Sequence, residues 1–316
     1  MATYLITGVA GFIGSNIACA LLSRGDTVRG VDNFITGKRE NLADLKGLDF
    51  IEGTIEDQAT CTRVCNGVDY IFHEAALASV PRSVADPVPT NSANVTGTLN
   101  VLMAAREANV RRVVYAGSSS AYGDQPTLPK HEEMSPDPIS PYAVSKLAGE
   151  HYMRSFTRVY GLETVVIRYF NVFGPHQDPS SQYSGVLAKF SLAMLEGHTP
   201  VIYGDGTQSR DFTYIENVVN ANLLAIQAPA EKVSGKVFNV ATAQRITLND
   251  AVRSLRELTG YSGPVEYAAP RAGDIAHSLA DISRAKEALG YEPTVNFHEG
   301  LRRTIAWYRG MAAAAK

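Results

Sequence analysis

A run of three glycines between two apolar segments constrains the fold of this chain more than any other feature. The segment TGVAGFIG places Gly8, Gly11 and Gly14 three residues apart. The preceding TYLITG is typical of a buried parallel strand, and the residues that follow repeat apolar side chains at helical spacing up to Gly25, a candidate helix C-cap. A strand, a tight glycine turn and a helix in this order predict a βα unit whose helix N-terminus can bind a phosphate.

Strand-like and helical segments alternate through the first half of the sequence. Further apolar strand candidates are TVRGVDN, DYIFHEAA, VRRVVYAGSS and ETVVIRYFN, with helical stretches over residues 94–107 and 142–160 among them. Parallel strands need crossover connections, and helices usually provide them. The alternation therefore predicts an α/β fold, a doubly wound parallel sheet of the Rossmann type with right-handed crossovers.

The sequence changes character near Asn171. From there VFGPHQDPSSQYSG is rich in glycine, proline and serine, and the alternation becomes irregular. We expect a first domain over residues 1–170 and a smaller α/β C-terminal domain over residues 171–316. The strand-like KVFNVA at residues 236–241 is expected to return to the first sheet.

Composition excludes several classes of protein. The chain has 316 residues, of which 45% are hydrophobic and 19% charged, so it can bury a large core. Its net charge is −3 with both signs dispersed, which provides neither a basic stripe for nucleic acid nor a polybasic membrane patch. The N-terminus lacks a basic signal region, and no apolar run reaches about 18 residues. We expect a soluble, cytoplasmic protein without nucleic-acid or membrane partners.

The three cysteines do not indicate a metal or a redox site. Cys61 and Cys65 are spaced by four positions, but no second pair and no histidine cluster accompanies them, and Cys19 lies far away in the sequence. Free thiols in a reducing compartment are expected, and no metal is predicted.

An acidic residue completes the pattern that the glycines begin. Asp32 ends the second strand candidate, 18 residues after Gly14, where a carboxylate can accept hydrogen bonds from ribose hydroxyls. It would repel a 2′-phosphate, so NAD is favoured over NADP, although Lys38 and Arg39 weaken this preference slightly. The alternative is a tight turn with no ligand. It is disfavoured because the strand, the glycines, the helix and the acidic residue all occur in the order and spacing of a dinucleotide site.

A tyrosine and a lysine are predicted to share one helix face. Ser140 and Pro141 are typical of a helix start, which places Tyr142 and Lys146 four positions apart on the helix. A tyrosine with a pKa near 10 is a poor base. A cation about 5 Å away, at an effective dielectric constant near 20, favours the phenolate by roughly 3 kcal/mol. Tyr142 is therefore a candidate general base.

Three serines follow the next strand candidate. Ser118, Ser119 and Ser120 would lie at the carboxyl end of the sheet, where doubly wound folds bind their ligands. Ser118 can form a hydrogen bond to a reacting oxygen, and its neighbours can contact the substrate. An exposed Tyr/Lys pair beside a serine-rich turn is the alternative, and the glycine turn earlier in the chain argues against it.

Together these motifs resemble the extended short-chain dehydrogenase/reductase superfamily, and within it the nucleotide-sugar 4-epimerases. The resemblance covers essentially the whole chain and rests on TGVAGFIG, DNFITGKREN, HEAA, NVTGTLNVL, SSSAYG, PYAVSK, RYFNVFGP, GDGTQSRDFTYIENV and RAGD. It implies catalytic roles for Ser118, Tyr142 and Lys146. It also implies that the nucleotide-sugar is held in the C-terminal domain.

The site residues expected from the motifs and the resemblance form two groups. Those expected to bind NAD are Gly8, Gly11, Phe12, Ile13, Gly14, Asp32, Asn33, Thr54, Ile55, Ala75, Asn94, Tyr142 and Lys146. Those expected to bind the substrate are Ser79, Arg82, Ser118, Ser119, Ser120, Asn171, Arg210, Arg271, Asp274 and Ser278. Thr54 departs from the family, which commonly has an aspartate there that helps bind adenine, and backbone contacts at Ile55 could replace it.

The same superfamily contains 4,6-dehydratases and decarboxylases. The dehydratases resemble one another in having Asp-Glu after the catalytic hydroxyl, and decarboxylases usually have Glu at the second of these positions. Here the positions are Ser119 and Ser120, which cannot perform that proton transfer at neutral pH. Reversible epimerisation at C4 remains: Tyr142 removes the hydroxyl proton, hydride passes to retained NAD, and the keto sugar turns before hydride returns.

Pocket size would set the substrate. The resemblance implies a gatekeeper four residues after Asp274, which is the small Ser278, and a small residue leaves room for a 2-acetamido group. UDP-N-acetylglucosamine and UDP-N-acetylgalactosamine are therefore expected, with UDP-glucose and UDP-galactose as further substrates. A UDP-glucuronic or N-acetyl uronic acid 4-epimerase is an alternative, since Arg82 could meet a carboxylate.

A non-catalytic NAD-binding regulatory protein is the alternative from another class. That class predicts loss of the tyrosine or the lysine, and both Tyr142 and Lys146 are present. Family analogy implies a homodimer through a helix bundle that includes residues 94–107 and 142–160. Surface polysaccharide synthesis and galactose metabolism both use such enzymes.

Overall fold

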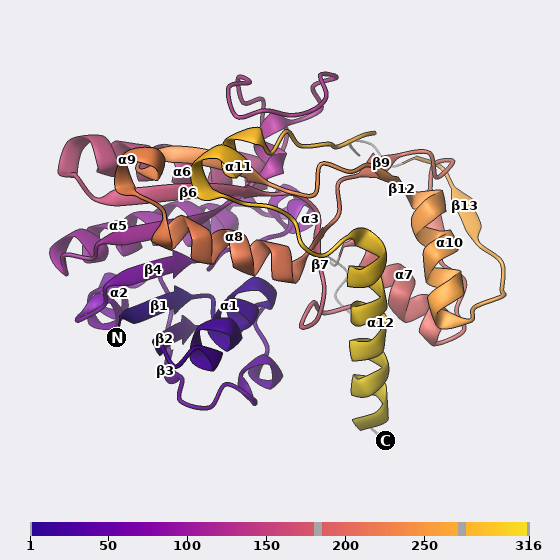
Figure 1. Cartoon of the computed structure of the whole chain (residues 1–316), viewed down its shortest axis with the longest axis horizontal. Helices are drawn as coiled ribbons and strands as arrows, with labels where there is room; N and C mark the ends of the chain where they lie inside the picture. The colour runs from indigo at the N-terminus through magenta and orange to yellow at the C-terminus, as the bar shows by residue number, and fades with distance from the viewer. Residues whose placement is uncertain (1, 180–184, 271–275, 315–316) are drawn as a thin grey trace.

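A parallel sheet organises the N-terminal half of the chain. In the computed structural model, which describes residues 2–179, 185–270 and 276–314, seven strands lie in the order β11-β6-β5-β4-β1-β2-β3, all paired in parallel (Figure 1). The strands are β1 (Thr3–Thr7), β2 (Thr27–Asp32), β3 (Asp49–Glu52), β4 (Tyr70–His73), β5 (Arg112–Ser118), β6 (Glu163–Tyr169) and β11 (Lys236–Val240). The predicted doubly wound α/β class is confirmed.

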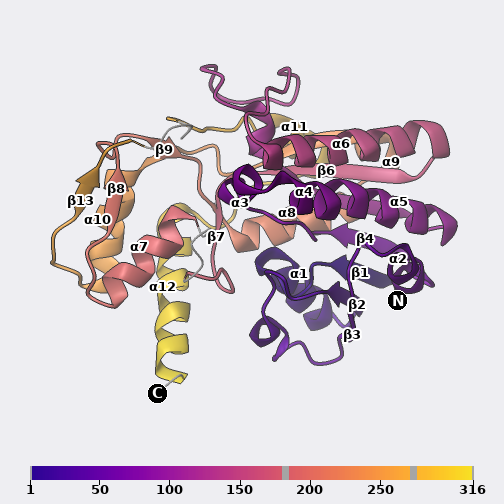
Figure 2. The same ribbon diagram turned by 180° about the vertical axis from the view of Figure 1, so that it is seen from behind.

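Helices cover both faces of this sheet (Figure 2). On one face lie α1 (Phe12–Ser23) and α8 (Ile215–Gln227), and on the other α2 (Gln58–Cys65), α5 (Gly97–Glu107) and α6 (Pro141–Tyr160). Successive strand residues point to opposite faces, so Leu5 packs into one apolar cluster while Tyr4 and Ile6 pack into the other. Burial on both faces explains why these strands are continuous apolar runs.

The second lobe is built from short elements. It contains α7 (Val186–Leu195), β8 (Val201–Tyr203), α10 (Leu248–Thr259), β13 (Glu266–Ala268) and α12 (Phe297–Ala314), and α12 projects from the body (Figure 1). Between the lobes, β7 (Val172–Phe173) pairs with β10 (Thr213–Tyr214), and β9 (Ser209–Arg210) pairs with β12 (Ile246–Thr247). β11 leaves this region and pairs with β6, while α9 (Ala230–Val233) and α11 (Ser283–Leu289) lie beside it.

The predicted helix over residues 94–107 differs in its start. The helical stretch begins earlier, with α3 (Val80–Ala85) and α4 (Pro87–Asn91), and passes through a π-helical turn at Ser92–Thr96 before α5. Asn94 therefore sits on the π turn and not at a helix start. β3 was not predicted from the sequence, because its four residues are only partly buried and show no long apolar run.

Buried or partly buried free thiols were expected, and Cys19 differs because its side chain is exposed. All three lie within the described part of the chain and none forms a disulfide. Cys61 and Cys65 are buried, and burial raises the pKa of each thiol to about 12, so neither is a reactive thiolate near neutral pH. Over the same residues, none of the helices has the length and apolar character needed to cross a membrane.

A buried ion pair fixes α6 against the sheet. The Arg168 Nε and Nη2 atoms of β6 donate to the two carboxylate oxygens of Glu150 on α6, at 3.0 and 2.8 Å. Both side chains are buried, and the guanidinium lies 4.6 Å from the Tyr122 ring centroid. Two parallel hydrogen bonds hold both partners in one orientation.

Replacing Glu150 by glutamine should destabilise the fold strongly, because it leaves the Arg168 charge buried and unpaired. We expect a loss of about 3–5 kcal/mol in the free energy of unfolding, measured by chemical denaturation. Glu299→Gln is the matched control, because Glu299 pairs with Arg302 at the surface and water screens that pair. Equal effects of the two substitutions would contradict this account.

Candidate active site

The glycine turn lies at the carboxyl edge of the sheet. Gly8 follows β1 with a φ of +72°, and its N–H donates to the Val31 carbonyl at 2.8 Å. A Cβ atom on Gly8 would lie 2.8 Å from the backbone of Ala75, and one on Gly14 would collide with the Gly8 carbonyl oxygen. The turn is therefore a cradle that only glycine leaves open, with Gly11 as the N-cap of α1. This geometry fits a pyrophosphate at the helix N-terminus.

Asp32 closes one side of this cradle. Its carboxylate accepts from the backbone N–H groups of Ala10, at 3.0 Å, and Phe34, at 2.8 Å, so its orientation is fixed. Burial raises the pKa of Asp32, and the backbone hydrogen bonds oppose that rise. A carboxylate held at the end of β2 can accept from ribose hydroxyls, as the sequence predicts.

Most residues expected to bind NAD line one pocket. The pocket lining contains Gly8, Gly11, Asp32, Asn33, Thr54, Ile55 and Ala75, together with Glu74, which was not predicted. Phe12 and Ile13 form the first turn of α1 beside it. Asn94 is buried, accepting from the Leu77 N–H at 2.8 Å and donating to Ser145 Oγ at 2.9 Å. Its amide connects the π turn to α6, and direct contact with NAD stays a prediction.

The start of α6 is fixed by two serines. Ser140 Oγ accepts from the Ala143 N–H at 3.2 Å and Pro141 occupies the first turn, as predicted. The Tyr142 N–H, which has no partner within the helix, donates to Ser83 Oγ at 3.0 Å. Ser83 is fully buried on α3 and positions Tyr142 through this hydrogen bond.

Lys146 lies one helical turn after Tyr142, in a low-dielectric environment. Its side chain is buried at 4% exposure, and Nζ lies 4.4 Å from the centroid of the Tyr115 ring. Burial lowers the pKa of Lys146 to about 8, against the opposing influence of the Glu74 carboxylate. Lys146 therefore changes charge close to physiological pH.

The Tyr142 hydroxyl differs from the sequence expectation in one respect. Burial raises its pKa, and a hydrogen bond with Ser118 opposes the rise. The sequence predicts that Lys146 lowers the pKa of Tyr142. In the structure, Lys146 Nζ lies against the Tyr115 ring, and the burial of Tyr142 is the largest influence on its pKa. Ser118, at the end of β5, lies close enough to Tyr142 to influence its pKa.

The three serines form a compact hydroxyl cluster. Ser118 Oγ accepts from the Ser120 N–H at 3.2 Å and from Ser120 Oγ at 2.8 Å, at the point where β5 turns into a short 3₁₀ helix over Ser119–Tyr122. Each of the three serines retains partial exposure. The cluster can thus offer hydroxyls to a ligand at the carboxyl end of the sheet.

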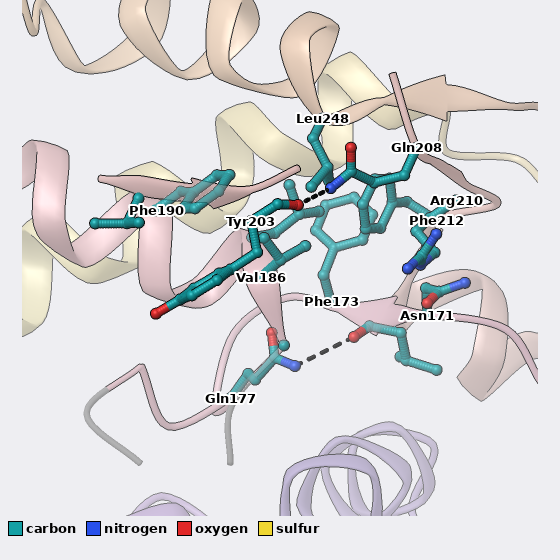
Figure 3. A pocket seen from close by; sticks show the side chains of 14 residues that line it. Asn171, Phe173, Gln177, Val186, Phe190, Tyr203, Gln208, Arg210, Phe212 and Leu248 are labelled. Carbon is teal, nitrogen blue, oxygen red and sulfur yellow. Dashed lines mark hydrogen bonds between the residues drawn. The ribbon is translucent and has the colours of Figure 1, made fainter. Parts of the chain in front are cut away.

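A second pocket of about 260 Å³ is lined by residues between Asn171 and Leu248, outside the seven-stranded sheet (Figure 3). Its apolar wall includes Phe173, Phe190 and Phe212, and Asn171 and Arg210 lie together near one end (Figure 3). Other residues of its lining are Val172, Gln177, Gly185, Val186, Leu187, Val201, Tyr203, Gln208 and Leu248. An apolar pocket with an amide and a guanidinium suits an aromatic group that carries an anion.

The gatekeeper candidate is connected to this pocket. Ser278 Oγ accepts from Asn171 Nδ2 at 3.1 Å and from the Asp211 N–H at 3.3 Å. Ser79 caps α3 by accepting from the Arg82 N–H at 3.2 Å, and it is buried. Arg271 and Asp274 lie outside the described residues.

Sequence reasoning missed the aromatic lining and Glu74. Phe173, Tyr203 and Phe212 come from separate segments, so no local pattern gathers them, although RYFNVFGP and RDF each place an aromatic residue beside a predicted ligand. Glu74 stands inside the HEAA motif at the end of a strand candidate. A charged residue at the end of an apolar strand could have indicated a site residue. Its side chain lies at the edge that holds Ser118.

Gly8→Ala should abolish retention of the dinucleotide, because the new methyl group would enter the backbone of Ala75 and the φ of +72° strains any L residue. Gly25→Ala is the control, since Gly25 has a φ of +80° and open space around its Cβ position. We expect Gly25→Ala to lose about 1 kcal/mol of stability at most while it keeps the dinucleotide. The measurement is dinucleotide released per mole of purified protein on denaturation, and full retention by Gly8→Ala would refute the cradle.

Comparison with known proteins identifies relatives along nearly the whole chain. The chain is 38% identical to the UDP-glucose 4-epimerase of Mycolicibacterium smegmatis over 96% of its own length and 98% of that protein. Among solved structures, UDP-glucose 4-epimerase of Thermotoga maritima with UDP-glucose is 39% identical, with a TM-score of 0.94 and coverage of 98% of this chain and 99% of that one. UDP-N-acetylglucosamine 4-epimerase of Methanobrevibacter ruminantium in complex with UDP-N-acetylmuramic acid is 40% identical, with a TM-score of 0.92 and the same coverages.

The family itself is identified by a profile match. The profile of the NAD dependent epimerase/dehydratase family matches residues 4–241, which include the glycine turn, the serine cluster and the Tyr142/Lys146 helix. The resemblance inferred from the motifs and the expected cofactor are thereby confirmed. This chain is a member of the NAD dependent epimerase/dehydratase family.

Proposed function

We propose that the protein is a UDP-sugar 4-epimerase that retains NAD and prefers the pair UDP-N-acetylglucosamine and UDP-N-acetylgalactosamine. The observation that carries the proposal is one sheet edge that holds both the glycine cradle after β1 and Ser118 at the end of β5, with Tyr142 in the first turn of α6 and the pocket of Asn171 and Arg210 in the second lobe. Relatives of comparable length that are named UDP-sugar 4-epimerases support the reaction class.

The protein residues would handle the proton and the orientation of the sugar. Bound NAD, held by the glycine cradle and Asp32, would supply the hydride acceptor and donor for C4 of the sugar. Tyr142 removes the proton of the C4 hydroxyl and restores it, and Ser118 holds that oxygen by a hydrogen bond. The raised pKa of Tyr142 keeps its phenol protonated near neutral pH, so little phenolate is available as the base, and a positive charge on Lys146 would favour the phenolate.

The nucleotide would anchor the substrate. An apolar pocket containing Phe173 and Phe212 suits the uracil ring, and the Arg210 guanidinium suits a phosphate oxygen. Holding the substrate by its UDP part leaves the sugar free to turn, which epimerisation requires. We place this function in residues 171–316 and NAD binding in residues 1–170 with β11, a division that stays a proposal.

The small Ser278 supports the N-acetylated substrate. Its hydroxyl lies within hydrogen-bond distance of Asn171 at the nucleotide pocket, and a larger side chain there would project toward the same region. Ser119 and Ser120 in place of acid residues argue against dehydratase and decarboxylase chemistry. A role in polysaccharide biosynthesis and a cytoplasmic location stay predictions.

The first test incubates the purified protein, without added NAD, with UDP-N-acetylglucosamine, UDP-glucose or UDP-glucuronic acid and resolves the 4-epimers by chromatography. Fastest conversion of the acetamido sugar is expected. Conversion of UDP-glucose alone would contradict the pocket argument, and conversion of the uronic acid alone would assign Arg82 to a sugar carboxylate. No conversion of any substrate after NAD is added would overturn the epimerase proposal.

Ser278→Tyr should lower the specificity constant for the acetamido sugar about tenfold or more relative to UDP-glucose, because bulk would fill the space for the 2-substituent. Ser278→Ala is the matched control: it removes the hydroxyl bonded to Asn171 but adds no bulk, so the ratio should be kept. A Ser278→Tyr enzyme with an unchanged substrate ratio would refute the gatekeeper role of Ser278.

Tyr142→Phe should lower kcat for both sugars by about 100-fold or more.

We propose that the protein is a homodimer through α6, as expected from the sequence, together with α3 and α4 in place of the expected residues 94–107. These helices pack together, and they expose Val84 at 65%, Val88 at 71% and Val144 at 52%. Exposed apolar side chains gathered on adjacent helices are typical of an interface. A second copy is the proposed occupant, because a two-fold axis places the same patch on both partners.

Charges in this patch should separate the dimer. Val88→Glu combined with Val144→Glu places four carboxylates in the interface of two copies, and desolvating them is unfavourable. We expect the molar mass by light scattering to fall by half, while Met311→Glu on α12, also at an exposed apolar position, leaves it unchanged. A monomeric wild-type protein, or a dimer that survives both substitutions, would contradict the proposal.

A further inference from the structure

Asp211 is a fully buried carboxylate that the reaction scheme above does not use. It stands between Arg210 and Phe212, which both line the nucleotide pocket (Figure 3). Its Oδ1 atom accepts from the Thr242 N–H at 2.9 Å and from the Thr242 hydroxyl at 2.7 Å. Its Oδ2 atom accepts from the Ala280 N–H at 3.2 Å. One side chain therefore joins the pocket lining to the residues after β11 and to the segment of Ala280.

The segment of Ala280 also carries Ser278, and it pairs with β9 in parallel. The Ser209 N–H donates to the Ala276 carbonyl at 3.0 Å, and the Ser278 N–H donates to the Ser209 carbonyl at 3.0 Å. A regular parallel ladder would continue with bonds between the main chains of Asp211, Ser278 and Ala280. Instead the Asp211 N–H donates to Ser278 Oγ at 3.3 Å, and the Ala280 N–H donates to the Asp211 carboxylate. Side chains thus replace the main-chain partners where the ladder stops.

The main chain of Asp211 is engaged elsewhere as a result. Its carbonyl oxygen, which a continued ladder would use, accepts from Asn171 Nδ2 at 3.2 Å. Asn171 Nδ2 also donates to Ser278 Oγ at 3.1 Å. Asn171 has a φ of +36°, which is uncommon for a residue other than glycine and persists only where neighbours hold it. Asn171 and Ser278 therefore belong to one network, and Asp211 is its anchor.

Fold stability alone does not require this carboxylate. Two backbone groups could connect the same segments without burying a charge, and a buried carboxylate is unfavourable unless donors satisfy it. Burial raises the pKa of Asp211, and the hydrogen bonds from Thr242 and Ala280 oppose that rise. What the side chain adds is a connection to Thr242 and a carbonyl that remains available to Asn171. Both additions fix residues at the edge of the substrate pocket.

We propose that Asp211 is a positioning residue for sugar specificity, which through Ala280 and Asn171 holds Ser278 beside the space for the 2-acetamido group. This inference rests on the proposed epimerase function, because that function gives Ser278 its place near the sugar. Asp211 itself needs no contact with the substrate, since Thr242 and Ala280 occupy its oxygens. A change at Asp211 should therefore affect the choice of sugar more than the binding of UDP.

Asp211→Asn breaks one branch of the network selectively. An amide has a single oxygen, and this oxygen is expected on the side of Thr242, where two donors converge. The amide NH₂ group then faces the Ala280 N–H, so that hydrogen bond is lost. Thr242→Val is the matched control, because it removes the hydroxyl bond to the same carboxylate but keeps the bond from Ala280.

The test measures the Kd values of UDP, UDP-glucose and UDP-N-acetylglucosamine by calorimetry on the purified protein with its bound dinucleotide. In Asp211→Asn the Kd of the acetamido sugar should rise about tenfold, while those of UDP and UDP-glucose change by less than about threefold. In Thr242→Val the ratio of the two sugar Kd values should stay within about twofold of the wild-type ratio. In turnover, Asp211→Asn should raise KM for the acetamido sugar with little change in kcat.

The binding readout is independent of turnover. An unchanged ratio of the sugar Kd values in folded Asp211→Asn overturns the positioning role, and so does an equal weakening of all three ligands. If the ratio changes in a protein that converts no UDP-sugar, the epimerase proposal fails while the role of Asp211 in binding stands. A wild-type protein that binds neither UDP-sugar would overturn both proposals.

Hydrogen exchange tests the arrangement if Asp211→Asn does not fold. In the wild-type protein the Ala280 N–H donates to a buried carboxylate, so it should exchange far more slowly than an unstructured peptide amide. Exchange of Ala280 at the rate of an unstructured peptide would overturn the anchoring role of Asp211.

Discussion

The parallel pairing of β4, β5 and β6 is the constraint on which the chemistry of this molecule depends. Their register sets His73 opposite Tyr115 and Ser118 opposite Tyr169, so three strands deliver their last residues to one edge. Glycine at the end of β1 and aspartate at the end of β2 continue this edge. Because parallel strands all end on the same side, residues far apart in the sequence meet without long loops.

One helix then brings the proton chemistry to that edge. Tyr142, Lys146 and Glu150 follow one another at intervals of four residues on α6, so the proposed general base, the lysine beside it and the structural anchor share one face. Ser83 holds the N-terminal end of this face and Arg168 holds its middle. Stability and catalysis therefore use the same packing, and a loose α6 would misplace the phenol as well as weaken the fold.

Local patterns explain which parts of this arrangement were predictable from sequence. The glycine turn, the Ser140 cap and the Tyr142/Lys146 spacing are each encoded within a few residues, and the structure agrees with them. The wall of Phe173 and Phe212 is not local, because tertiary folding gathers its members from separate segments. The electrostatics are not local either: burial raises the pKa of Tyr142, which spacing alone could not indicate.

The return of β11 to the sheet has a consequence for synthesis of the chain. Until residues 236–240 leave the ribosome, β6 presents an unpaired edge of apolar residues, and until residues 215–227 have emerged α8 cannot cover one face of the sheet. Nascent chains that carry only the N-terminal half are therefore prone to associate through that edge. Pairing by β11 and packing by α8 therefore protect the N-terminal sheet from association. Truncation after residue 170 should yield insoluble protein.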